Sequence, residues 1–146
     1  MPATRQSHLL IVEEETTLAE VTAFRLELLG FSVQVARNAE EAIPLLKQKK
    51  PDLMIVDLKL PGAGGIAFIE RLASEIETAA IPVIALSFDA ELEQVQRAFS
   101  AGAADFLVAP YNPAVLEEKV EHLLAEAVQL KSGGKDKKDK PVFQKA

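Results

Sequence analysis

The sequence has no cysteine and no tryptophan, and aromatic residues make up only 5% of it. The absence of cysteine excludes a disulfide framework, a thiolate metal site and a cysteine nucleophile. The apolar runs are no longer than a β-strand, and the opening residues MPATRQSH contain no hydrophobic signal segment. We therefore expect a cytoplasmic protein that makes no contact with a membrane.

Charge is distributed unevenly along the chain. The 146 residues carry a formal net charge of −6, but residues 131–146 contain six lysines and two aspartates, which leaves −10 on residues 1–130. An acidic body repels a phosphate backbone, so we expect no direct binding of nucleic acid. Residues 1–130 have the length of one ordinary domain. Residues 131–146 are rich in Lys with little to bury, which predicts a flexible tail or linker, or else a docking peptide around Val142 and Phe143.

Five short apolar runs alternate with segments of helical spacing. The runs, which we interpret as strands, cover residues 8–12, 31–36, 53–56, 83–86 and 105–108. Five repeats of strand and helix predict an α/β fold with a five-stranded parallel sheet, doubly wound, and helices on both faces. Near-continuous apolar runs such as LMIV and VIAL fit strands that are buried on both sides.

The predicted helices are defined by apolar residues three and four positions apart. They are Leu18, Val21, Phe24 or Arg25 and Leu28 or Leu29 in the first helix; Ala42, Leu45, Leu46 and Lys49 in the second, with Pro44 near its start; Ile66, Ile69, Leu72 and Ala73 in the third; Phe88, Leu92, Val95 and Phe99 in the fourth; and Leu116, Val120, Leu123, Ala127 and Leu130 in the fifth. Gly30 and Gly102 stand where helix C-terminal caps are expected. Asn112 is a suitable N-cap for a helix that starts at Pro113.

Acidic residues and a hydroxyl follow the predicted strands. Glu13, Glu14 and Glu15 follow the first strand, Asp57 the third, Ser87 the fourth and Ala109 the fifth. Ligand sites in parallel sheets lie at the carboxyl ends of the strands, so these residues should meet at one edge. Glu13, Glu14 and Asp57 would suit a hard cation such as Mg²⁺, which would offset their repulsion. We expect Glu15 to be a charge at the start of the following helix.

The order of these elements and motifs resembles the receiver domain of bacterial response regulators, the CheY-like family. The resemblance rests on the acids after the first strand, IVDLKLPG at the third, a hydroxyl after the fourth and a proline after the fifth. It covers nearly all of residues 1–130 and implies a flavodoxin-like (βα)5 fold. It also implies that Asp57 accepts a phosphoryl group from a histidine kinase, and that Glu13, Glu14, Asp57 and the backbone carbonyl of Lys59 bind Mg²⁺.

The resemblance further implies a switch. Ser87 would hydrogen-bond the phosphoryl group, and Phe106 occupies the aromatic switch position. The face formed by helix 4, strand 5 and helix 5 would change and meet a protein partner. The resemblance also implies a cis Ala109–Pro110 bond, although most X–Pro bonds in folded proteins are trans, and the sequence leaves both isomers open.

The sequence departs from the family pattern at several of these positions. The family has a lysine before the proline of the fifth strand, where this chain has Ala109, whose methyl group cannot neutralise a phosphoryl group. By the family pattern Lys59 points outward, so we do not expect it to substitute. Glutamates occupy both metal-binding positions, which should loosen a Mg²⁺ site that requires short distances. Gly64 stands where an aspartate is common, and Phe106 lacks a hydroxyl.

Two functions fit this pattern. We favour an atypical receiver, in which phosphorylation-driven switching is weakened or lost, Mg²⁺ binding is weak or absent, and the domain acts through protein–protein contact. The alternative is a conventional receiver that a histidine kinase switches through Asp57 and Mg²⁺, which the retention of Asp57 and Ser87 favours. We do not expect an enzyme, because a phosphohydrolase with an aspartyl nucleophile would need a base that the sequence does not offer near Lys59.

Overall fold

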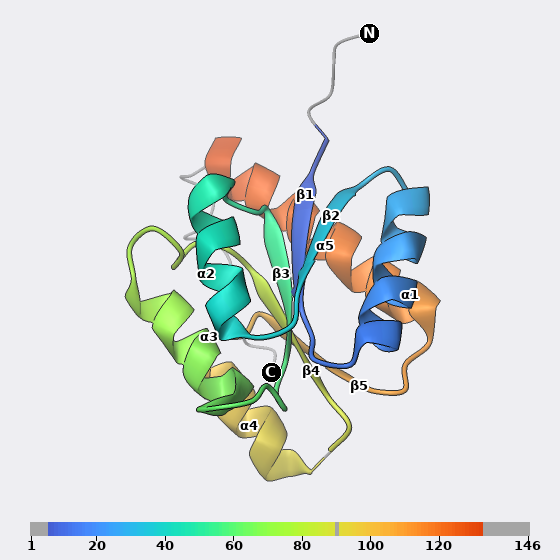
Figure 1. Ribbon diagram of the computed structural model, residues 1–146. Coiled ribbons are helices and arrows are strands. Elements are labelled where there is room, and N and C mark those ends of the chain that lie inside the picture. The colour runs from blue at the N-terminus through green and yellow to red at the C-terminus, as the bar shows by residue number, and fades with distance from the viewer. Residues whose placement is uncertain (1–5, 90, 133–146) are drawn as a thin grey trace, which may run out of the picture.

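The chain forms one open sheet with five helices (Figure 1). The computed structural model describes residues 6–89 and 91–132, so the docking peptide expected around Val142 and Phe143 lies outside the described residues. The strands are β1 (His8–Val12), β2 (Ser32–Ala36), β3 (Leu53–Asp57), β4 (Val83–Ser87) and β5 (Asp105–Val108). The helices are α1 (Thr16–Leu28), α2 (Ala39–Gln48), α3 (Gly64–Ser74), α4 (Leu92–Ala101) and α5 (Pro113–Ser132).

The sheet is parallel throughout, with the strand order β2-β1-β3-β4-β5. The order changes direction between β1 and β3, which places the topological switch point beside these two strands. Their carboxyl ends carry Glu13 and Asp57, respectively. The doubly wound architecture predicted from the alternating pattern is confirmed.

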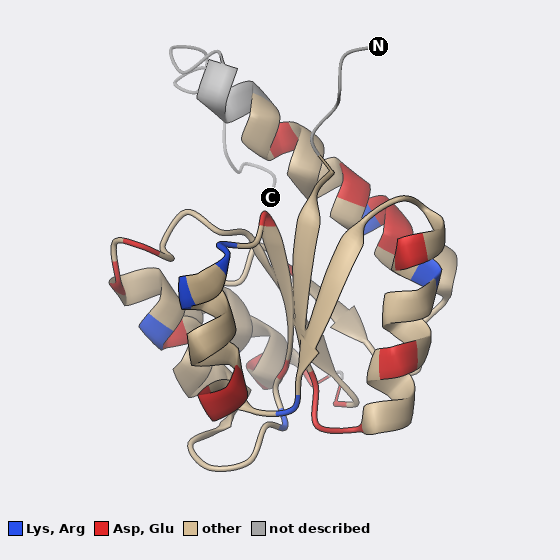
Figure 2. Cartoon of the chain, turned by 45° about the horizontal axis from the view of Figure 1, so that its top comes forward, with Lys and Arg blue, Asp and Glu red and all other residues tan. Residues whose placement is uncertain are grey.

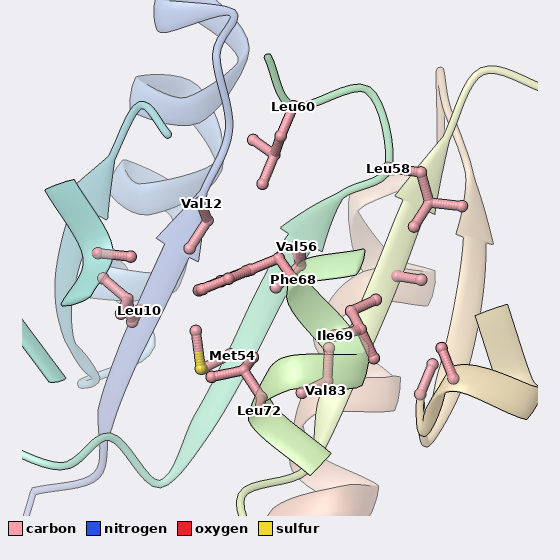
Figure 3. Close-up of a cluster of buried hydrophobic side chains, with 14 of the residues drawn as sticks. Leu10, Val12, Met54, Val56, Leu58, Leu60, Phe68, Ile69, Leu72 and Val83 are labelled. Atoms are coloured by element: carbon pink, nitrogen blue, oxygen red, sulfur yellow. The ribbon is translucent and has the colours of Figure 1, made fainter. Parts of the chain in front are cut away.

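Successive side chains along the central strands point to opposite faces of the sheet and pack in two different hydrophobic cores. Leu10, Val12, Met54 and Val56 point toward Phe68, Ile69 and Leu72 of α3, as Figure 3 shows, in the core that α2, α3 and α4 cover. Leu9, Ile11 and Ile55 enter the opposite core under α1 and α5. This alternation follows from the two-residue period of a strand and explains why the strands are apolar on both faces.

The apolar spacing correctly located helix α1, but most of the residues that define this spacing are not buried. The described side chains at Val21, Phe24 and Leu28 are 53%, 60% and 70% exposed, whereas α1 buries Ala19, Thr22, Ala23 and Leu26. The helix is apolar around most of its circumference, so the spacing of its largest residues does not identify the buried side. The small Ala19 and Ala23 pack on the sheet side together with Leu26, while other large apolar residues of the helix remain outside.

The spacing also fails for α4, whereas in α3 it identifies the buried Ile69 and Leu72 and is wrong only at Ala73. Phe88 precedes α4, which starts only at Leu92, and Leu92 and Phe99 are exposed while Ala98 and Ala101 are buried. In α3 the unpredicted Phe68 is buried, whereas Ala73 is exposed. In each of these helices the contact with neighbouring elements decides which side is buried, and the sequence period alone does not contain that information.

The predicted helix ends are largely confirmed. Gly30 and Gly102 have φ values of 101° and 126°, which suits glycine after a helix. Asn112 Oδ1 accepts a hydrogen bond from the Ala114 N–H at 2.9 Å, as expected of an N-cap. Three strand ends differ from the prediction: β2 starts one residue later, at Ser32, and β3 and β4 each run one residue further and include Asp57 and Ser87.

Candidate functional site

A cavity of about 570 Å³ lies at the carboxyl ends of β1 and β3. It is lined by Glu13, Glu14, Glu15, Thr16, Asp57, Lys59 and Phe88. Figure 2 shows the acidic colouring of the loop between β1 and α1 at this edge of the sheet. The three glutamates and Asp57 therefore line one space, although they come from segments far apart in sequence.

Glu13 is buried at the floor of this site. The pKa of its carboxyl group is raised to about 8, mainly by burial and to a smaller extent by a hydrogen bond with Asp57. The Glu15 N–H donates to Glu13 Oε2 at 2.9 Å and opposes this shift. Without a bound cation, burial therefore favours the protonated form of Glu13 at neutral pH.

Glu14 and Glu15 differ from Glu13 in their surroundings, since both are exposed. Glu15 is the N-cap of α1 and accepts a hydrogen bond from the Leu18 N–H at 2.8 Å. The expectation that Glu15 is a helix-start charge is thus confirmed. Glu14 lines the cavity without a comparable backbone partner in the described part of the chain.

Asp57 is the last residue of β3 and is held by two kinds of contact. Its position is fixed by pairing with Leu86 of β4, and its Oδ1 accepts a hydrogen bond from the Lys59 N–H at 3.0 Å. The side chain is buried but borders the cavity. One of its carboxylate oxygens is thus fixed by the following turn, in a site that is open to solvent.

Ser87 ends β4, next to β3 in the sheet. Its side chain is buried, and its Oγ accepts a hydrogen bond from the Asp89 N–H at 2.9 Å. Ser87 lines a second cavity of about 340 Å³ together with Leu58, Lys59, Phe88, Asp89 and Gln94. Because Lys59 and Phe88 line both cavities, the two spaces meet at these residues.

Ala109 follows β5 and is 4% exposed. Its N–H donates to the Ser87 carbonyl at 2.7 Å, which joins the end of β5 to the end of β4. The Ala109–Pro110 bond is cis, which the sequence had left open. Phe106 is half-buried and packs against the core under α2, α3 and α4.

The residues at the switch point can be compared with the ligands that Mg²⁺ requires. Among the residues the structure describes, no group of three or more His, Cys, Asp or Glu side chains is placed to hold a metal ion. Mg²⁺ needs only one or two carboxylates, however, because it keeps several of its waters. Glu13 and Asp57 share a hydrogen bond and provide such a pair. The donor set therefore fits the ion through these two carboxylates, once Glu13 has lost its proton.

Sequence reasoning missed two features of this site. Phe88 lines both cavities, although its spacing had placed it in a helix; its position directly after Ser87, at the end of a strand, was the available signal. Tyr111 and Thr22 form a side-chain hydrogen bond that joins α1 to the segment after β5. Burial raises the pKa of the Tyr111 hydroxyl. No local pattern reveals this contact, because it joins positions 89 residues apart.

No helix in the described ranges, 6–89 and 91–132, combines the length and the apolar character that crossing a membrane requires. This finding agrees with the short apolar runs of the sequence.

Comparison with known proteins identifies the family. Residues 9–121 match the response regulator receiver domain. The phosphate regulon transcriptional regulatory protein PhoB of Escherichia coli is 34% identical over 116 residues, which are 80% of this chain and 51% of that protein. The chain spans about half the length of the curated relatives it matches.

Solved structures agree with this result. A signal receiver domain of a signal transduction histidine kinase from Syntrophus aciditrophicus is 34% identical, with a TM-score of 0.76 over 82% of this chain and 91% of the other. A putative response regulator from Chloroflexus aurantiacus is 31% identical, with a TM-score of 0.79 over 83% of this chain and 99% of the other. The chain therefore belongs to the response regulator receiver domains of two-component signalling.

Proposed function

We propose that this domain is an atypical receiver, in which Asp57 is the phosphoacceptor position but phosphorylation drives the switch weakly, and which acts through protein–protein contact. The observation that carries this proposal is Ala109. Its buried methyl group occupies the position where the family pattern has a lysine. A methyl group donates no hydrogen bond and carries no charge, so the end of β5 has nothing with which to hold a phosphoryl group.

The remaining groups support phosphotransfer chemistry of reduced efficiency. An oxygen of the Asp57 carboxylate attacks phosphorus, and the new O–P bond forms as the P–N bond to the kinase histidine breaks. Mg²⁺ held by Glu13, Asp57 and the Lys59 carbonyl, with Glu14 at the rim, would neutralise charge on the transferring group. Ser87 is the hydroxyl next to Asp57 that can donate a hydrogen bond to that group once its Oγ turns toward the cavity.

The proposed partner surface is the face formed by α4, β5 and α5. Apolar side chains at Phe88, Leu92, Phe99, Val108 and Val115 are exposed there or beside it. Exposed apolar groups gathered on one face are typical of protein contact sites. Binding through them requires no phosphoryl group, which fits a domain whose switch is weakened.

The alternative is a conventional receiver that a histidine kinase switches through Asp57 and Mg²⁺. The adjacency of Asp57 and Ser87 on neighbouring strands favours it, since both side chains are buried and border connected cavities. In this alternative, the hydrogen bond from Ser87 would suffice to couple phosphorylation to the surface.

An amide NMR titration separates the two functions. Mg²⁺ is added first, and then beryllofluoride as a phosphoryl mimic. An atypical receiver should shift at Glu13 and Asp57 with Mg²⁺ and respond to the mimic only at high concentration, with small changes on α4. Saturation at low concentration, with shifts throughout α4 and β5, would contradict the proposal and support the conventional receiver.

A further inference from the structure

Lys59 is a cationic residue that lies between the two cavities of this acidic site. It lines both the cavity of Glu13 and Asp57 and the cavity of Ser87. Among the described residues it is the one Lys or Arg that lines either cavity. A group bound to Asp57 and facing Ser87 would therefore have Lys59 as its neighbouring cation.

The backbone contact of Lys59 fixes the starting point of its side chain. The Lys59 N–H lies 3.0 Å from Asp57 Oδ1. An extended lysine side chain spans roughly 6 Å from Cα to Nζ, and a phosphoryl group places its oxygens only two bonds from the carboxylate oxygen. The ammonium can therefore reach such an oxygen by rotation of its side chain, without movement of the backbone.

Lys59 is also free to make this contact. The ion pairs of the described residues involve Arg25, Arg71, Lys119 and His122, and none includes Lys59. Its side chain is exposed. An unpaired, flexible ammonium beside several carboxylates is available to a new anion, although ordering its long side chain reduces the gain.

We propose that the Lys59 ammonium is the charge partner of a phosphoryl group on Asp57, in place of the lysine that Ala109 replaces. This inference rests on Asp57 as the phosphoacceptor position of the proposed function. It differs from the expectation, taken from the family pattern, that the Lys59 side chain points away from the site. A cation on an exposed, flexible side chain holds an anion less firmly than a buried one, which agrees with a weakened switch.

The test is the affinity for beryllofluoride in the presence of Mg²⁺, measured by NMR on the whole chain. Lys59→Met retains the apolar stem and removes the charge, and should weaken binding by about 10-fold or more, as expected for loss of a hydrogen bond to a charged group. Arg37→Met is the matched control, because Arg37 is an exposed cation at the end of β2 that lines neither cavity. This control should leave the affinity unchanged.

A direct readout distinguishes a charge contact from a structural effect. The ¹³Cε–¹Hε signal of Lys59 should shift when beryllofluoride is added, and the corresponding signal of Lys47 in α2 should not. Equal affinity of wild type and Lys59→Met, or a Lys59 signal that does not move, would overturn the inference.

Ala109→Lys separates this inference from the proposed function. If the wild type fails to bind the mimic but Ala109→Lys binds it, Lys59 is not a substitute, while Asp57 remains the phosphoacceptor position of an atypical receiver. If neither protein binds, both the inference and the phosphoacceptor assignment of Asp57 are overturned. If Ala109→Lys restores binding in the Lys59→Met background, the two lysines are interchangeable, as the inference requires.

Discussion

The three consecutive glutamates after β1 have three different environments. Glu13 is buried and shares a hydrogen bond with Asp57, Glu14 is exposed at the cavity rim, and Glu15 caps α1. Their mutual repulsion is reduced because one of them retains a proton and another interacts favourably with the helix N-terminus. A sequence read as a row of three negative charges therefore overstates the charge of the site at neutral pH.

This arrangement predicts a pH-dependent stability. The pKa of Glu13 is raised from 4.5 to about 8 by folding, so between these values the folded state binds more protons than the unfolded state. The free energy of unfolding should therefore fall as the pH rises through this window, and should lose that slope in Glu13→Gln. Urea unfolding at pH 5, 6.5 and 8 without divalent cations measures this difference.

Glu14→Gln is the matched control for that experiment, because Glu14 is adjacent but exposed. It should keep the wild-type slope. The quantity to compare is the difference in free energy of unfolding between the wild type and Glu13→Gln. If this difference is the same at pH 5 and pH 8, Glu13 is ionised in the folded state. Saturating Mg²⁺ should displace the proton and flatten the slope in the wild type.

At the scale of elements, the turn from β3 into α3 positions Asp57. A Cβ atom added to Gly65 would lie 2.2 Å from the Asp57 carbonyl oxygen and 2.5 Å from Leu58 Cα. Gly65→Ala should therefore destabilise the protein by about 1–3 kcal/mol, even though alanine favours a helix, because backbone atoms must move. Urea unfolding measures the loss, and amide shifts should report a displaced Asp57.

Gly62→Ala provides the comparison, since an added Cβ there meets nothing within 4 Å. Its φ of +82° predicts a loss of about 1–2 kcal/mol from backbone strain alone. The Asp57 resonance should stay in place in this variant. A stable Gly65→Ala with an unmoved Asp57 would mean that the turn is looser than the structure shows.

The exposed apolar residues of α4 give a second prediction at this scale. Leu92→Gln and Phe99→Gln should each change the free energy of unfolding by no more than about 0.5 kcal/mol, since both side chains are exposed. Ala98→Gln should destabilise by at least about 1 kcal/mol, because Ala98 is fully buried and the longer side chain does not fit. Thermal or urea unfolding of the three variants decides between the observed face and the one predicted from spacing.

These elements show what the sequence could and could not predict. The strands were predictable because burial on both faces makes them apolar without interruption, as in Met54–Val56. The buried faces of α1 and α4 were not, because alanines make up much of each contact, and only Leu26 among the larger apolar residues of these helices is fully buried. At the site, the convergence of Glu13 and Asp57 followed from sheet topology, whereas the raised pKa of Glu13 depends on burial that only the fold defines.

At the scale of the whole molecule, the site has two physical connections to the surface. The first runs from Ser87, whose Oγ accepts a hydrogen bond from the Asp89 N–H, toward α4. The second runs from Ala109 through Pro110 to Tyr111, which hydrogen-bonds Thr22 of α1. In the proposed function, a phosphoryl group on Asp57 would act on the Ser87 connection through the serine hydroxyl. The Ala109 side chain has no polar group through which a phosphoryl group could act on the other connection.

We therefore predict an asymmetric response to beryllofluoride and Mg²⁺ at saturating concentration. In the wild type, amide shifts should extend from Asp57 and Ser87 through Asp89 into α4, while Tyr111 and Thr22 stay unchanged. In Ala109→Lys the new ammonium should contact the mimic and add shifts at Tyr111 and Thr22, because ordering of the lysine side chain would displace the segment that follows β5. Shifts at Tyr111 in the wild type would instead show that the movement spreads through packing alone, and that the missing lysine is not what separates the two connections.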